Sequence, residues 1–167
     1  MKTYDSKLII LRGNSGSGKS TIAKHLREVS GHKIAIVEQD YLRRFVLKEK
    51  EKEGANNIDL IYRTVIFALS RNYDVVLEGI SYFPRYGKML QKLVQACPNN
   101  YVYYFDVSVE ETIKRHVTKI NAHEFGETQL REWYRHQDLT NFDTEVIIPE
   151  SSSFEETVEQ IVKETGI

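Results

Sequence analysis

Eight consecutive residues near the N-terminus have the types and the spacing of a phosphate-binding loop. They are Gly13, Asn14, Ser15, Gly16, Ser17, Gly18, Lys19 and Ser20. This order matches the pattern G-x-x-x-x-G-K-[ST] and lies between an apolar run and a segment of helical period, the context that the pattern requires. Glycines let backbone N–H groups approach phosphate oxygens, and a helix start adds positive potential. The loop is therefore predicted to bind the phosphates of ATP or GTP.

The residues that close this loop supply a cation and hydroxyl groups. Lys19 is expected to reach the β- and γ-phosphates, and the Ser20 hydroxyl is expected to ligate Mg²⁺. For Thr21, a contact with the α-phosphate and a plain position at the helix start both stay open. Glu78 follows the apolar residues 75–77. It resembles a compact Walker B carboxylate that holds Mg²⁺ through water, with a salt bridge at a strand end as the alternative.

Asp40 is the candidate base for a phosphoryl transfer. It closes the segment 36–40, and ligands of an open parallel sheet collect beyond the carboxyl ends of its strands. A carboxylate there can accept the proton of an acceptor hydroxyl. The alternative is a helix N-cap, a position that favours Asp. One of Arg43 and Arg44 is expected to clamp an anionic acceptor or the transferred phosphoryl group, unless it is an ordinary surface arginine.

Further acceptor contacts are expected in the loop that follows Glu78. Tyr82, Phe83 and Arg85 are predicted to line an acceptor pocket together with Asp40 and Glu78.

A basic stretch after the fourth expected strand is the candidate for a lid. A kinase must keep water away from the γ-phosphate, commonly by closing a mobile basic segment over it. We expect a helical lid insertion at about residues 115–136, with Arg115, Arg131 and Arg135 as phosphate or acceptor contacts and surface charge as the alternative for each. Arg115 and Arg131 are also candidates for a catalytic role. Three histidines here lack the spacing of a zinc site: His116, His123 and His136.

Short apolar runs rich in Val, Ile and Tyr alternate along the chain with longer segments of helical period. This alternation is typical of βα units around a parallel sheet. The expected strands are residues 7–12, 33–38, 74–78, 101–106 and 144–148. We therefore predict an α/β fold of three αβα layers with a five-stranded parallel sheet, built as one domain over residues 1–167.

Local signals predict several helices. Ser108 with Glu111, and Ser153 with Glu156, match the capping box that begins a helix. The alternating charges of residues 48–53 predict a solvated helical face with ion pairs four residues apart.

The amino-acid composition limits which binding partners and which cellular compartment can be expected. The 23 basic and 24 acidic residues give a formal net charge of −1, which argues against obligate non-specific binding of nucleic acid but leaves room for a local basic cleft. Cys97 is the single cysteine, so no intramolecular disulfide can form, and its apolar setting predicts a buried structural thiol. No apolar run approaches the roughly 20 residues that span a bilayer. We expect a cytoplasmic protein without a membrane or obligate protein partner.

With the loop, Asp40, Glu78 and the basic stretch in place, the chain resembles the small P-loop kinases grouped around chloramphenicol phosphotransferase, zeta toxins, gluconate and shikimate kinases and the kinase domain of polynucleotide kinase. The resemblance implies a P-loop fold of the nucleoside-monophosphate-kinase type, ATP or GTP with Mg²⁺, an aspartate that faces the acceptor hydroxyl, and an arginine-bearing lid. Asp40 and either Arg115 or Arg131 match these roles by position. The chain departs from shikimate kinase because it has no D-x-D pair after the second strand and no triple-glycine loop.

The sequence therefore predicts a Mg²⁺-dependent kinase that transfers the γ-phosphoryl group of ATP to a hydroxyl of a small molecule. Sugars, nucleosides, sugar nucleotides and antibiotics are the expected acceptors. A polynucleotide 5′-hydroxyl kinase is the alternative with the same chemistry. A nucleotide-binding switch or slow NTPase is the alternative of a different class.

Overall fold

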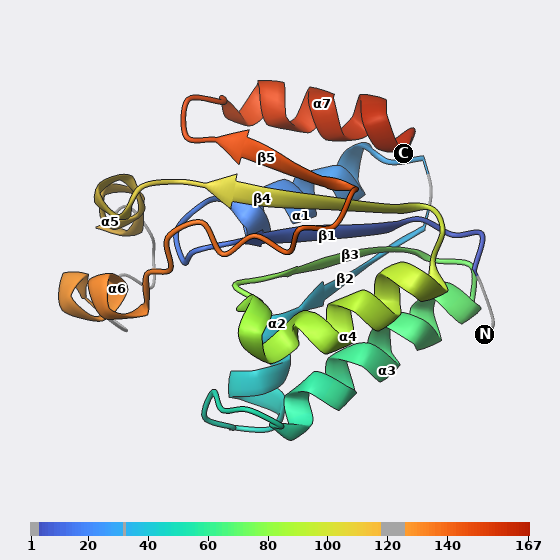
Figure 1. Ribbon diagram of the computed structural model, residues 1–167. Coiled ribbons are helices and arrows are strands. Elements are labelled where there is room, and N and C mark those ends of the chain that lie inside the picture. The colour runs from blue at the N-terminus through green and yellow to red at the C-terminus, as the bar shows by residue number, and fades with distance from the viewer. Residues whose placement is uncertain (1–3, 32, 118–125) are drawn as a thin grey trace.

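The computed structural model describes residues 4–31, 33–117 and 126–167. Its five strands form one parallel sheet in the order β2-β3-β1-β4-β5 (Figure 1). The strands are β1 (Leu8–Gly13), β2 (Ile34–Glu38), β3 (Asp74–Gly79), β4 (Asn100–Asp106) and β5 (Glu145–Pro149). All five expected strands are confirmed within one residue at each end, and the order places β1, which leads into the phosphate loop, at the centre of the sheet.

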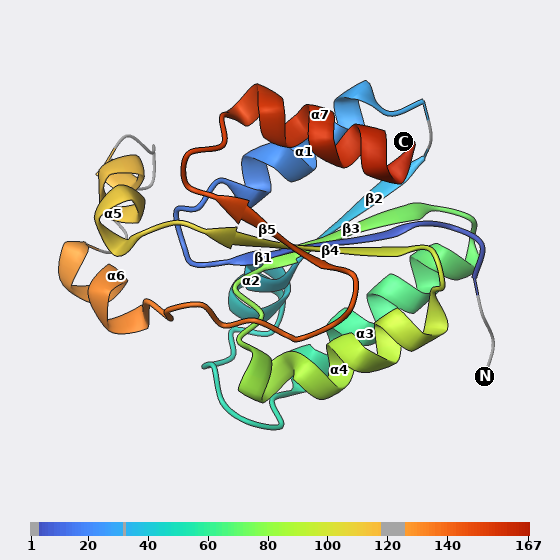
Figure 2. The same cartoon turned by 45° about the horizontal axis from the view of Figure 1, so that its top comes forward.

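Helices cover both faces of the sheet, which confirms the predicted three-layer αβα arrangement (Figures 1 and 2). One face carries α1 (Lys19–Val29) and α7 (Phe154–Thr165), and the other carries α3 (Asn56–Ser70) and α4 (Phe83–Ala96). The other helical segments lie toward the carboxyl ends of the strands: α2 (Gln39–Tyr41), the π-helical turn η1 (Leu42–Val46), α5 (Val109–Val117) and α6 (Glu127–Trp133). In the described part of the chain, no helix has the length and apolar character needed to cross a membrane.

The central strand β1 shows why the sheet has two hydrophobic cores. Leu8 and Ile10 pack into the core shared with α3 and α4, whereas Ile9 and Leu11 pack into the core shared with α1. Because a central parallel strand is covered on both faces, its two alternating sets of side chains are both apolar. Cys97 is buried in the first of these cores, as predicted, and burial raises the pKa of its thiol to about 11.

The charged segment 48–53 is not helical, so the prediction of a solvated helical face is wrong. Lys48 has a positive φ of 50°, and Glu49 turns back onto the start of α3. Its carboxylate accepts hydrogen bonds from the backbone N–H groups of Asn56 at 3.2 Å and Asn57 at 2.9 Å. The free N–H groups at a helix start attract a carboxylate, and Glu49 supplies one from outside the helix. The hydrogen bonds from Asn57 and Asn56 lower the pKa of Glu49 to about 2.

Of the two predicted capping boxes, one is complete. At the start of α7 the Glu156 N–H donates to Ser153 Oγ at 3.1 Å, and the Ser153 N–H donates to the Glu156 carboxylate at 2.8 Å. Before α5 the Glu111 N–H donates to Ser108 Oγ at 3.2 Å, but the Ser108 N–H donates to Glu150 at 2.7 Å. The second box is incomplete because the Glu111 carboxylate forms ion pairs within its own helix.

Candidate functional site

The loop between β1 and α1 has the backbone geometry of a phosphate cradle. Gly13 and Gly16 have positive φ angles of 142° and 85°, where other residues are strained. A Cβ at Gly13 would lie 2.7 Å from the Phe105 carbonyl oxygen, and one at Gly16 would lie 2.8 Å from the Thr112 carbonyl oxygen. Helix α1 begins at Lys19 with no side-chain cap from the described residues, so its positive end is open to an anion. The loop therefore fits the phosphates of a nucleoside triphosphate.

The ammonium group of Lys19 lies within this loop. Its Nζ donates hydrogen bonds to the Asn14 carbonyl oxygen at 2.7 Å and to Ser17 Oγ at 3.1 Å, and the residue is buried. A cation held at this depth is a fixed point charge for phosphate oxygens. The contact of Lys19 with the β- and γ-phosphates stays a prediction that this geometry supports.

The two predicted magnesium ligands meet beside the loop. Ser20 Oγ donates a hydrogen bond to Glu78 Oε1 at 3.0 Å. The strand register explains the meeting, because β3 pairs with β1 and β2 so that Glu78 lies opposite Leu11 and Glu38. Burial raises the pKa of the Glu78 carboxyl, and the charge of the Lys19 ammonium opposes this rise.

This hydroxyl and carboxylate fit a magnesium ion that is shared with a bound triphosphate. Mg²⁺ usually takes one or two protein oxygens and completes its octahedron with phosphate oxygens and waters. Over residues 4–31, 33–117 and 126–167, no group of three His, Cys, Asp or Glu side chains could hold a metal by itself. Ser20 and Glu78 are hard oxygen donors next to the phosphate loop, so they are the residues that would hold the ion.

Asp40 lies directly beyond β2, on the same edge of the sheet. Helix α2 begins one residue earlier, at Gln39, so the alternative of Asp40 as the helix cap is wrong. Its carboxylate accepts hydrogen bonds from Arg43 Nη2 at 2.6 Å and Arg44 Nη1 at 3.2 Å, and its side chain is 52% exposed. Besides burial, the charge of Asp40 raises the pKa of Glu78, because the two carboxylates are close. The structure therefore brings Asp40 to the side of the predicted magnesium ligands.

Three residues that were predicted to contact the acceptor form one cluster. Tyr82 and Arg85 come from the loop after β3 and the start of α4, and Arg135 follows α6. The guanidinium carbons of Arg85 and Arg135 lie 5.6 and 5.4 Å from the centre of the Tyr82 ring, within reach of a cation–π interaction. Arg85 also forms an ion pair with Glu51 at 3.3 Å. The acceptor role of this cluster stays a prediction.

The arginines on the predicted lid have different surroundings. Arg115 Nη1 donates to the Ser17 carbonyl oxygen at 3.5 Å, so its guanidinium lies against the phosphate loop. Arg131 forms ion pairs with glutamates of α6 and α5 at 2.8 and 3.3 Å, which hold it between these helices rather than at the loop. Residues 118–125 of the stretch, with Lys119 and His123, lie outside the described residues. The lid itself therefore stays a prediction.

A cavity of about 300 Å³ adjoins the phosphate loop on the side of β4 and β5. Its walls include Gly18, Thr21, Arg115, Pro149 and Phe154. A concave surface with apolar walls and a few polar groups is typical of a site for a small organic ligand. Its place beside the loop suits the base and ribose of the nucleotide. Thr21 faces this cavity, and its contact with the α-phosphate stays a prediction.

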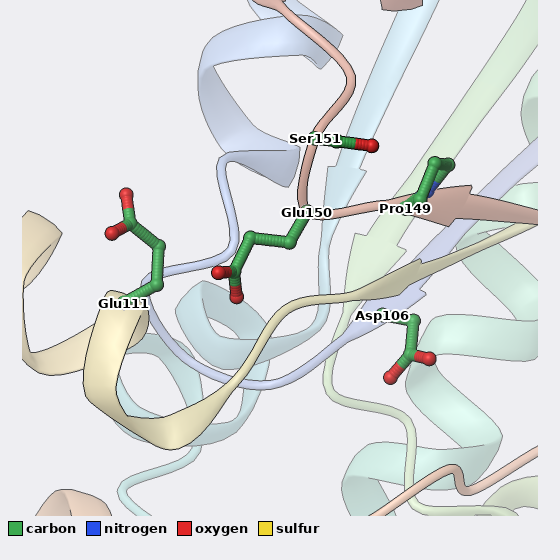
Figure 3. A pocket seen from close by; sticks show the side chains of 5 residues that line it. All are labelled: Asp106, Glu111, Pro149, Glu150 and Ser151. Carbon is green, nitrogen blue, oxygen red and sulfur yellow. The ribbon is translucent and has the colours of Figure 1, made fainter.

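A second and more open pocket of about 590 Å³ lies at the carboxyl ends of β4 and β5 (Figure 3). The side chains of Asp106, Glu111 and Glu150 give it an acidic lining. The hydrogen bond from Arg115 lowers the pKa of Glu111, and those from Ser108 lower the pKa of Glu150. Both carboxyls are therefore negatively charged at neutral pH, which makes this pocket unsuitable for phosphates.

The sequence analysis missed the role of Arg12, which directly precedes the phosphate loop. Its guanidinium is completely buried and donates to the Ser81 carbonyl oxygen at 3.1 Å, to the Asp138 carboxylate at 2.6 Å and to the Glu145 carboxylate at 3.1 Å. Its carbon also lies 5.9 Å from the Phe83 ring centre, so Phe83 packs here although it was expected in the acceptor pocket. The signal available in the sequence was a charged residue directly after the apolar run 8–11 of the central strand.

The sequence analysis also missed the role of the Asn14 side chain. Asn14 Nδ2 donates to the Arg135 carbonyl oxygen at 2.7 Å, and the Arg135 N–H donates to Asn14 Oδ1 at 2.8 Å. This reciprocal pair fixes the backbone of Arg135 to the phosphate loop. The motif leaves the Asn14 position free and the partners lie 121 residues apart, so the sequence offered no signal for the pair.

Comparisons with known proteins agree with this architecture. A family model described as an AAA domain matches residues 8–139. Among solved structures, the chain is similar to the APS kinase CysC of Mycobacterium tuberculosis, with 16% identity and a TM-score of 0.73 over 98% of this chain and 99% of that one. It is similar to a gluconokinase from Sinorhizobium meliloti 1021, with 16% identity and a TM-score of 0.64 over 99% of this chain and 94% of that one.

A third similar structure is a chain of the Pnkp1/Rnl/Hen1 RNA repair complex. It has 22% identity and a TM-score of 0.59, and the match covers 99% of this chain but 46% of that one. No curated protein matches the sequence significantly. Identities this low show a shared fold alone, and that fold is the predicted P-loop fold of small kinases.

Proposed function

The protein belongs to the AAA domain family, whose model matches residues 8–139, and we propose that it is a Mg²⁺-dependent phosphotransferase. It transfers the γ-phosphoryl group of ATP to a hydroxyl of a small molecule such as a sugar, nucleoside, sugar nucleotide or antibiotic. One observation carries the proposal. The paired Ser20 and Glu78 lie beside the phosphate loop with the Asp40 carboxylate close by.

The nucleotide would be held by backbone and by charge. The loop N–H groups and Lys19 bind the phosphates, the base and ribose occupy the cavity beside Thr21, and Arg115 approaches from α5. Ser20 and Glu78 would hold Mg²⁺, and the bound ion would supply positive charge for the transfer. Arg131 is a weaker candidate for a catalytic role than Arg115, because its ion pairs lie between α5 and α6.

Asp40 would take part in the transfer itself. The acceptor oxygen forms a bond to the γ-phosphorus while the bond from that phosphorus to the bridging oxygen of ADP breaks. The hydroxyl proton passes to the Asp40 carboxylate, which Arg43 and Arg44 hold in place. Phosphoryl transfer leaves little covalent chemistry to the protein. The main tasks of these side chains are therefore to position the reactants and to stabilise the charge of the transition state.

A screen of ATP consumption over hydroxylated acceptors would identify the substrate and test this proposal. Lys19→Ala should abolish transfer and weaken nucleotide binding, because it removes the buried cation of the loop. Asp40→Asn should abolish transfer and leave nucleotide binding intact. Asp59→Asn is a matched control, because Asp59 forms an equivalent ion pair with Arg63 four residues away on α3.

Other results would favour the alternatives. Full transfer by Asp40→Asn to an identified acceptor would show that Asp40 is not the base. Tight nucleotide binding with slow hydrolysis and no acceptor in the screen would favour a switch or slow NTPase. Labelling of an oligonucleotide end and of no small molecule would favour a polynucleotide 5′-hydroxyl kinase.

A further inference from the structure

The turn that carries Asp40 leaves its aromatic side chains in solvent. Tyr41 and Phe45 are 55% and 60% exposed, and their rings stack with centroids 5.5 Å apart and an interplanar angle of 22°. Along residues 39–46 only Gln39 is buried. Exposed apolar surface of this kind indicates a binding site, and π-helical turns such as η1 are frequent at functional sites. The pair is therefore suited to a flat, apolar ligand group.

Guanidinium groups flank this aromatic pair. The carbon of the Arg44 guanidinium lies 5.9 Å from the Phe45 ring centre. Arg43 is only 17% exposed, and its buried Nε has no hydrogen-bond partner among the described residues. A buried donor without a partner is uncommon and costs free energy. Arg43, which pairs with Asp40, therefore has one hydrogen-bond donor, Nε, that the described residues leave unsatisfied.

The cluster around Tyr82 adds a second pair of guanidinium groups at the same end of the sheet. Arg85 and Arg135 both lie over the Tyr82 ring. Arg43 Nη1 donates to the Glu49 carbonyl oxygen at 3.4 Å, and Arg85 forms an ion pair with Glu51, two residues further along, at 3.3 Å. The two pairs of arginines are therefore neighbours in space although they come from different parts of the chain.

Two of these four arginines, Arg43 and Arg44, bond the same carboxylate, that of Asp40, and Arg85 pairs with Glu51. Guanidinium groups bind phosphate oxygens through paired hydrogen bonds. A phosphate is therefore the anionic group that the cluster fits best.

We propose that the acceptor is a nucleotide, which combines a flat base and a phosphate with the hydroxyl to be phosphorylated. The base stacks on Tyr41 and Phe45, the phosphate binds the guanidinium cluster, and the hydroxyl faces Asp40. This inference rests on the proposed function and narrows its acceptor class. A free nucleoside phosphate and the hydroxyl end of a nucleic acid strand present the same chemistry.

The test compares acceptors in the presence of Mg²⁺ and ATP labelled at the γ-phosphate. Adenosine 3′-phosphate carries both groups, adenosine lacks the phosphate, and glycerol 2-phosphate lacks the base. We expect kcat/KM for adenosine 3′-phosphate to exceed each of the other values by about tenfold or more. A short DNA strand with a 5′-hydroxyl distinguishes the two sources, because it is labelled better than the free nucleotide only if a strand end is the substrate. Equal values for the three small acceptors would overturn the proposal.

Two variants separate the base from the phosphate. Phe45→Ala should remove most of the preference for adenosine 3′-phosphate over glycerol 2-phosphate, and Arg135→Gln should remove most of the preference over adenosine. Phe67→Ala and Arg71→Gln are matched controls. Phe67 is 63% exposed on α3 and Arg71 lies 5.5 Å from its ring centre. A loss of preference in the controls as large as in the site variants would contradict the assignment.

A binding measurement keeps this inference separate from the proposed function. Equilibrium dialysis of labelled adenosine 3′-phosphate is carried out with protein saturated with Mg²⁺ and a non-hydrolysable ATP analogue. Binding that Phe45→Ala weakens, without transfer to any acceptor, would refute the proposed function and support the nucleotide site. Transfer to a sugar or an antibiotic, without binding of adenosine 3′-phosphate, would refute the nucleotide site and support the phosphotransferase. Absence of binding and of transfer would refute both.

Discussion

Replacing the buried Arg12 with methionine should destabilise the protein by about 3–5 kcal/mol. The substitution leaves the Asp138 and Glu145 carboxylates, whose side chains are 12% and 5% exposed, without their cation. It also removes the donor that bonds the Ser81 carbonyl oxygen. For a chain of 167 residues, a loss of this size lowers Tm by roughly 6–20 °C. Arg12→Lys should recover only part of it, because an ammonium cannot reproduce the guanidinium fork.

The loss should be larger at pH 7.5 than at pH 5. Burial raises the pKa of the Asp138 carboxyl above its ordinary value of 3.8, and the charge of Arg12 opposes this rise. Without Arg12 the pKa rises further, so the folded variant binds a proton that the unfolded chain releases. Its stability is therefore greatest at acidic pH and falls as the pH rises through the folded pKa.

Urea unfolding followed by circular dichroism at both pH values measures this effect. Arg63→Met is the matched control, because Arg63 forms an exposed ion pair with Asp59 and its replacement should be close to neutral. A free energy of unfolding for Arg12→Met that equals the control value would refute the reasoning. An equal loss at pH 5 and pH 7.5 would refute the assignment of the effect to Asp138.

Three further predictions concern single side chains. Gly16→Ala should weaken nucleotide binding about tenfold or more, measured by titration calorimetry, because a Cβ at φ 85° would lie 2.8 Å from a carbonyl oxygen of α5. Gly31→Ala is the control, because a Cβ there meets no atom of the described residues within 4 Å. Cys97, with a pKa of about 11, should react with iodoacetamide at pH 8 only after unfolding, and rapid labelling of the folded protein would contradict its burial. Glu49, with a pKa of about 2, should contribute stability that is present above pH 4.5 and lost as the pH falls toward 2. An acid-unfolding profile of Glu49→Gln as steep as that of the wild type would exclude this role.

The strands could be predicted from sequence because their signal is local. In β1 both alternating sets of side chains are apolar, which already indicates a strand covered on both faces. The segment 48–53 could not be predicted in this way. Its charge pattern is compatible with a helix, but the structure uses Glu49 at the start of α3, and that use depends on where the next helix begins.

The candidate site shows the same contrast between residues that local patterns predict and residues whose contacts depend on tertiary packing. Ser20 and Glu78 were expected together, because parallel strands end at one edge of the sheet whatever the separation in sequence. The bonds of Arg12 to Asp138 and of Asn14 to Arg135 join residues 126 and 121 positions apart, and each depends on the path of the segment after α6. Such side-chain pairs follow from tertiary packing, which neither a motif nor a hydrophobic period records.

The bond between Asn14 and Arg135 also bears on the order in which the protein becomes competent during synthesis. The phosphate loop leaves the ribosome early, yet its Asn14 partner follows 121 residues later, and the adjoining cavity takes part of its wall from Phe154 and Thr157. Because domains generally complete their folding after their last element emerges, a nascent chain that ends before Arg135 should carry the motif without a finished nucleotide site. Nucleotide is thus expected to stabilise the released chain rather than the growing one.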